Sequence, residues 1–217
     1  MQIGVIGARE LPEKHQGLVE EVVQYLLGRG HIVAHGGALG ADHYVLKTLL
    51  AHCGVNRSVL YSAWQSPASF PKALQPDLTQ FMALGGKVLW GAGNSGMPYP
   101  AVAAALLGRN VRLVNNCHGL VAFLHGKSKG TLSAVAMAQR RKIPIILFPL
   151  SEHSDLPQQK GMRWYPNPPF GLWQGSLKAM YSSFYQPSSS GYSMASQILA
   201  PAPPPAGAPK HEAMIYA

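Results

Sequence analysis

Short runs of hydrophobic residues alternate with longer amphipathic segments along the first 150 residues. Runs typical of buried strands, each ending near a glycine or another turn residue, occupy 2–7, 31–37, 58–63, 87–93, 119–126 and 143–149. Helical spacing of apolar residues occupies 13–28, 41–53, 78–84, 100–116 and 131–142. Strands that alternate with helices predict a mostly parallel sheet covered on both faces, which is a Rossmann-like three-layer α/β sandwich.

The composition changes near residue 150. Ten of the 18 prolines fall in the last 67 residues, together with many serines and scattered aromatic residues. We therefore expect a Rossmann-like domain at 1–150 and a C-terminal extension at 151–217. The aromatic residues in 161–185 predict a partly packed arm, whereas the sequence PAPPPAGAP at 201–209 is low-complexity and favours an extended chain. An aromatic arm with little charge also predicts a homo-oligomer that forms through this extension.

Positive charge is concentrated in the first part of the chain. Residues 1–150 hold 14 of the 18 Lys and Arg residues and six of the nine Asp and Glu residues, and the whole chain carries a formal charge of +9. Such a surface favours an anionic partner, either a nucleotide, a single-stranded nucleic acid or an acidic protein, although a basic solvated face is the plainer alternative. No apolar run approaches the ~20 residues of a membrane span, and no signal peptide is recognised, so we expect a cytoplasmic protein without a membrane partner.

The sequence predicts neither a metal site nor a cofactor. The two cysteines do not form a CxxC pair, and the nine histidines include no HExxH motif. His35 and His125 stand beside glycine-rich loops, where each could contact a ligand or simply bond within its loop.

Three glycine-rich loops follow predicted strands, at 7–9 (GAR), 35–42 (HGGALGAD) and 125–131 (HGKSKGT). The carboxyl ends of parallel strands meet at one edge of a sheet, where ligands of this fold class bind. Backbone N–H groups at such loops, followed by helix N-termini, can hold a phosphate. The spacing matches neither GxxxxGK[ST] nor GxGxxG. Each feature alone is also explained by turn or capping chemistry. The predicted phosphate-binding residues from these loops are Gly7, Arg9, Gly36, Gly37, Gly40, Asp42, Gly126, Ser128, Gly130 and Thr131.

These segments, in this order and with GRN at 108–110, resemble the SLOG superfamily, which includes the Smf/DprA DNA-processing proteins, the LOG phosphoribohydrolases and the YspA-related proteins. The resemblance spans roughly residues 1–150. It implies a Rossmann-like domain whose glycine loops hold a nucleotide-type ligand or a nucleic-acid backbone. It also adds Arg109 and Asn110 to the predicted pocket.

One departure from the LOG enzymes bears on catalysis. Their PGGxGTxxE motif carries a glutamate implicated in cleaving the ribose–base bond, and Ala134 stands at that position here. Whether the protein is an enzyme stays open, with little or no catalysis favoured. The leading hypothesis is therefore binding of a nucleotide or a nucleotide-derived phosphate ligand. The alternatives are DprA-like binding of single-stranded DNA, hydrolysis of a nucleotide N-glycosidic or phosphate bond, and a structural or assembly protein with an idle pocket.

Overall fold

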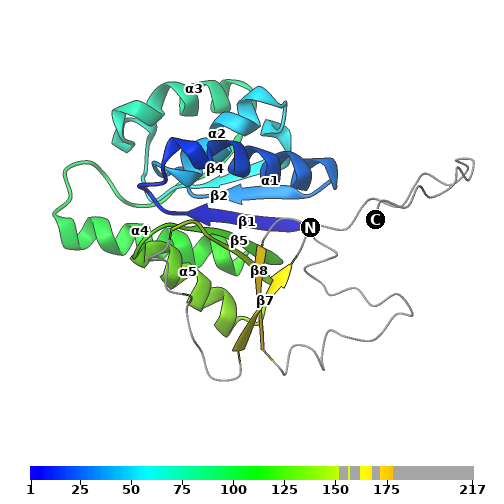
Figure 1. The fold of residues 1–217 in the computed structure, drawn as a ribbon. Helices are drawn as coiled ribbons and strands as arrows, with labels where there is room; N and C mark the ends of the chain where they lie inside the picture. The colour runs from blue at the N-terminus through cyan, green and yellow to red at the C-terminus, as the bar shows by residue number, and fades with distance from the viewer. Residues whose placement is uncertain (152–155, 157–161, 168–171, 178–217) are drawn as a thin grey trace, which may run out of the picture.

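The protein folds around one twisted sheet, seen edge-on in Figure 1. The computed structural model describes residues 1–151, 156, 162–167 and 172–177. Within these, the strand order is β4-β3-β2-β1-β5-β6-β8-β7. The first six strands are mutually parallel, as predicted: β1 (Gln2–Gly7), β2 (Ile32–His35), β3 (Ser58–Tyr61), β4 (Lys87–Leu89), β5 (Gly119–Leu124) and β6 (Ile145–Pro149). The Rossmann-like α/β fold is confirmed.

Helices cover both faces of the sheet (Figure 1). One layer holds α1 (Gln16–Gly28), α2 (Ala41–Ala51) and α3 (Gln75–Ala83), and the other holds α4 (Tyr99–Asn115) and α5 (Lys129–Arg140). Alternate residues of the strands serve the two layers. Val121 and Phe123 of β5 join the core under α1 and α2, whereas Ala122 and Leu124 join the core under α4 and α5. Strands buried on both faces explain why each appears in the sequence as a continuous apolar run.

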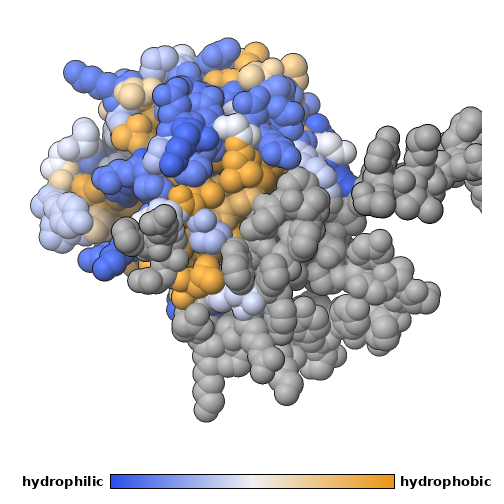
Figure 2. All heavy atoms as spheres, viewed as in Figure 1, coloured by the Kyte–Doolittle hydropathy of each residue, from blue (hydrophilic) through white to orange (hydrophobic). Residues whose placement is uncertain are grey.

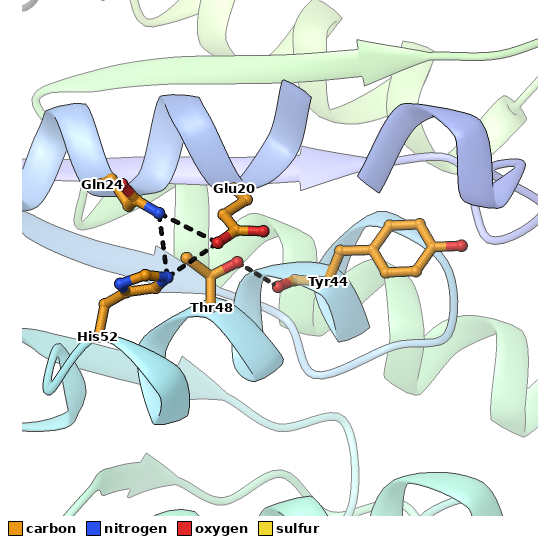
Figure 3. Close-up of polar contacts among 5 residues, drawn as sticks. All are labelled: Glu20, Gln24, Tyr44, Thr48 and His52. Atoms are coloured by element: carbon orange, nitrogen blue, oxygen red, sulfur yellow. Dashed lines mark hydrogen bonds and ion pairs between the residues drawn. The ribbon is translucent and has the colours of Figure 1, made fainter. Parts of the chain in front are cut away.

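Polar contacts link the helices of the first layer. His52 Nε2 lies 2.8 Å from Glu20 Oε1, and Gln24 Nε2 donates to the same oxygen at 3.1 Å, which ties the end of α2 to α1 (Figure 3). His43 Nε2 lies 2.7 Å from Asp77 Oδ2 and ties α2 to α3. The Glu20–His52 pair is more than one-third exposed, so it contributes about 1 kcal/mol at most. Figure 2 shows hydrophilic residues gathered over this layer, with hydrophobic residues between it and the grey atoms.

The sheet continues into the C-terminal extension. Two strands that the sequence pattern did not predict, β7 (Met162–Asn167) and β8 (Leu172–Leu177), form an antiparallel pair, and β8 pairs antiparallel with β6. Trp164 packs against the core under α4 and α5. The predicted low-complexity end at 201–209, and the aromatic residues beyond 177 from which association was predicted, lie outside the described residues.

None of the described helices has the length and apolar content needed to span a membrane.

Candidate site at the carboxyl edge of the sheet

The strand order reverses at β1, which lies between β2 and β5. The chain builds β2, β3 and β4 on one side of β1 and then crosses through α4 to add β5 and β6 on the other. The loops after β1 and β5 therefore diverge to opposite faces and leave a crevice beyond the strand ends. A cavity of about 760 Å³ occupies this place, bounded by the end of β1, the loop after β5, the start of α5 and one side of α4.

Most of the predicted site residues meet at this cavity, although they come from four separate segments. The nine that line it are Gly7, Arg9, Asp42, Arg109, Asn110, Gly126, Ser128, Gly130 and Thr131. Gly36, Gly37 and Gly40 do not line it. Of the two histidines beside the loops, His125 lines the cavity, whereas His35 is completely buried and does not line it.

The start of α5 provides donors for an anion. Ser128 is the N-cap residue, and its Oγ lies 2.9 Å from Thr131 Oγ1. The amides of the first helical turn have no acceptor within the helix, and the helix dipole adds partial positive charge there. Lys127 and Lys129 are exposed on either side of Ser128. The combination of amides, hydroxyls and ammonium groups suits a phosphate oxygen.

A buried ion pair connects Arg109 of α4 to Asp42 of α2. Arg109 Nη1 donates to Asp42 Oδ2 at 2.9 Å, and the two side chains are only 7% and 5% exposed. The amide of Ala38 donates to the same oxygen at 3.2 Å. Asp42 Oδ1 and Arg109 Nε have no hydrogen-bond partner among the described residues. Burial raises the pKa of Asp42, and the adjacent Arg109 offsets only part of that increase.

The three glycines outside the cavity make room for protein atoms. A Cβ at Gly36 would stand 1.0 Å from Arg109 Nη1, so the guanidinium occupies the space that this glycine leaves. Gly40 has φ 73° and ψ −128°, and a Cβ there would stand 2.3 Å from the carbonyl oxygen of Ala8. Gly37 also has a positive φ, 61°, and packs against Leu60 and Phe70.

The cavity also has an apolar wall that the sequence did not predict. Tyr99, Val102, Ala103, Leu106 and Leu107 of α4 line it. Tyr99 belongs to the glycine-rich stretch at 91–100. The apolar residues of α4 have ordinary helical spacing, which does not distinguish a residue that faces a cavity from one that faces the core.

His35 makes the stability of the fold depend on pH. Burial and the nearby Arg109 lower the pKa of His35 to about 3. The unfolded chain binds a proton near pH 6.5 and the folded protein does not, so this contribution to stability is complete above pH 6.5 and is lost as the pH falls towards 3.

Because of His35, we expect the free energy of unfolding to be about 2 kcal/mol lower at pH 5 than at pH 7. Urea denaturation of the native protein and of His35→Leu at both pH values measures this. Asp42 is present in both proteins, so its opposite contribution cancels in the difference. Equal losses in the two proteins would contradict the assignment.

These features define a Rossmann-like α/β protein with a cation-lined cavity at the point where the strand order reverses. The sequence model of one family, DNA recombination-mediator protein A, matches residues 1–165, and the chain belongs to that family. This confirms the resemblance to the SLOG superfamily and points to its Smf/DprA members.

Solved structures show the same fold at low sequence identity. DNA processing protein A from Helicobacter pylori, described for its unique single-stranded DNA binding mode, matches with a TM-score of 0.60 and 19% identity over 71% of this chain and 68% of its own. DNA processing protein A from Streptococcus pneumoniae matches with 0.57 and 19% over 70% of this chain, which spans about half (51%) of that protein. The molybdenum cofactor binding protein from Rippkaea orientalis gives 0.50 and 18%, over 69% and 77%. A comparison with curated proteins gave no match.

Proposed function

We propose that this protein binds single-stranded DNA through its phosphate backbone at the carboxyl edge of the sheet. The observation that carries the proposal is a set of three cations that line the cavity, Arg9, Lys127 and Lys129, which form no ion pair within the described part of the chain. Membership of the DNA recombination-mediator protein A family supports the choice of DNA among anionic partners. The similarity of the fold to that of the H. pylori protein, whose structure is described for its single-stranded DNA binding mode, supports the proposal further.

The electrostatics of the edge favour a polyanion. Arg9, Lys127 and Lys129 are exposed and form no ion pair among the described residues. Asp42 is paired with Arg109, so Glu10 is the one carboxylate of the cavity lining without an ion-pair partner among the residues that the structure describes. Three cations against one anion favour several adjacent phosphates over a single carboxylate.

The test is the salt dependence of binding to a labelled oligothymidine, measured by fluorescence anisotropy. Three neutralised phosphates predict a slope near −2 in a plot of log K against log salt, since each contributes about −0.7 for a single strand. The triple variant Arg9→Gln, Lys127→Gln, Lys129→Gln should bind at least 10-fold more weakly and give a slope near zero.

A matched variant controls for the loss of three charges. Lys47, Lys87 and Arg140 are also exposed and do not line the cavity, so their replacement by Gln changes the net charge equally. This control should keep most of the affinity and most of the slope. Equal weakening of the two triple variants would mean that DNA is attracted only by net charge, and the proposal would fail.

A small nucleotide is the second candidate, and the volume of the cavity favours it. A cavity of about 760 Å³ lies within the range of sites that hold whole small molecules. If such a ligand is bound at residues 126–131, a mononucleotide should raise the melting temperature of the native protein and not that of a Gly130→Val, Thr131→Val variant. Its affinity should depend only weakly on salt, because amides and hydroxyls carry the contact. Hydrolysis has less support, since Ala134 is buried in α5 and supplies no carboxylate.

A further inference from the structure

The Asp42–Arg109 ion pair borders the cavity and is nevertheless shielded from solvent. Both residues line the cavity, although their side chains are almost completely buried. Arg109 Nη1 and the amide of Ala38 both donate to Asp42 Oδ2, whereas Asp42 Oδ1 accepts no hydrogen bond within the described part of the chain. The carboxylate therefore has one oxygen, Oδ1, that can take a proton without breaking either of these bonds.

In its ionised form the pair carries no net charge, so Arg109 adds little to the attraction that the exposed cations of the cavity exert on an anion. A phosphate beside the pair would meet the carboxylate of Asp42 as well as the guanidinium. Two anions at a buried place repel each other strongly, because burial removes the screening that water and salt provide. Protonation of Asp42 removes this repulsion and leaves Arg109 as an additional positive charge at the cavity.

Asp42 is better suited to take this proton than the other titratable groups nearby. Burial and the nearby Arg109 lower the pKa of His35 to about 3, so this buried histidine is neutral. Glu10, the other carboxylate among the described residues that line the cavity, is exposed to water, which screens it from an anion. Burial raises the pKa of Asp42, and a bound anion would raise it further. The remaining charged or titratable side chains of the lining are Arg9, His125, Lys127 and Lys129.

We propose that anion binding in the cavity is coupled to protonation of Asp42 at Oδ1, so that binding of DNA takes up a proton from the solvent and becomes tighter as the pH falls. This inference rests on the DNA binding proposed above. The coupling is reciprocal: a bound phosphate favours the protonated carboxyl group, and the protonated carboxyl group favours the phosphate to the same extent.

The test is isothermal titration calorimetry of the native protein with an oligothymidine at pH 7, in two buffers of equal ionic strength that differ in their heat of ionisation. The difference between the two binding enthalpies measures the number of protons taken up. About one proton per bound strand is expected, which corresponds to binding that weakens about 10-fold for each unit of pH near pH 7.

Two variants identify the group that takes up the proton. Asp42→Asn has the charge of the protonated form and keeps an oxygen for the amide of Ala38, so it should bind at pH 7 at least as tightly as the native protein and take up no proton. His125→Asn is the matched control, because His125 lines the same cavity and is the other group that could take up a proton near pH 7. This control should keep the proton uptake.

The outcomes separate the coupling from DNA binding itself. Equal binding enthalpies of the native protein in the two buffers would overturn the coupling and leave DNA binding intact. Uptake that persists in Asp42→Asn, or that is lost in His125→Asn, would also overturn it, because another group would then take the proton. Circular dichroism checks that each variant folds, and if Asp42→Asn does not, the native protein and His125→Asn still decide the question. Failure of the native protein to bind at physiological salt would refute DNA binding and the coupling together.

Discussion

Asp42→Leu is expected to lower the free energy of unfolding by about 3–5 kcal/mol, which is a large part of the stability of a domain of this size. The substitution leaves the buried guanidinium of Arg109 without its carboxylate partner. Arg109 is 6% exposed and its guanidinium donates to Asp42 Oδ2, so the variant holds a buried cation without its counter-ion. Urea denaturation at pH 7 measures the loss directly.

A double variant makes this prediction specific to the ion pair. Asp42→Leu combined with Arg109→Met removes both charges and keeps similar volumes, and such replacements are often neutral or stabilising. We expect the double variant to recover at least half of the stability that Asp42→Leu loses. If the double variant is less stable than Asp42→Leu, the loss comes from packing around α2 and not from an unpaired charge.

The sequence predicted the sheet well because its parallel strands, apart from the edge strand β4, are largely buried on both faces. Continuous apolar runs such as 119–124 then coincide with strands, and amphipathic segments such as 16–28 coincide with the helices that cover them. The pair β7 and β8 gave no such signal. It contains Pro166 and Gly175, residues that weaken a strand pattern and are tolerated near the edge of a sheet, where this pair lies.

The glycine loops were informative about position but not about what each glycine is for. A glycine in a turn leaves space, and only the tertiary structure determines whether a ligand or a protein atom fills it. At Gly36 the atom is Arg109 Nη1, which is 73 residues later in the chain and has no local trace in the sequence. The sequence placed Arg109 of the GRN segment at the pocket only because this segment resembles one in the SLOG superfamily.

The apolar wall of the cavity was missed for a related reason. The periodicity of α4 identifies its hydrophobic residues but not where the sheet ends beneath them. Leu113 lies over the sheet and is fully buried, whereas Leu107 lies beyond the strand ends and is 46% exposed. The offset between a helix and the strands that it covers depends on loop lengths and packing, which hydrophobic spacing does not encode.

Gly40→Ala is the second substitution for which we expect a large loss, at least about 3 kcal/mol of unfolding free energy, from two separate costs. The backbone at Gly40, with φ 73° and ψ −128°, is in a region that residues with a Cβ rarely adopt. The new Cβ would also stand 2.3 Å from the carbonyl oxygen of Ala8 and 2.4 Å from that of Arg9. Relief of this clash must move the loop after β1 away from the start of α2, where Ala41 N donates to Ala8 O at 3.1 Å.

Two further glycines divide that loss into its parts. Gly85 has φ 82° with nothing within 4 Å of a Cβ, so Gly85→Ala should cost about 1–2 kcal/mol from backbone conformation alone. Gly108, inside α4, has open space and a helical backbone, so Gly108→Ala should add up to about 1 kcal/mol. Urea denaturation of the three variants should therefore rank Gly108→Ala above the native protein, Gly85→Ala below it and Gly40→Ala lowest. Similar losses at Gly40 and Gly85 would mean that the loop after β1 moves away from the new Cβ without an energetic cost.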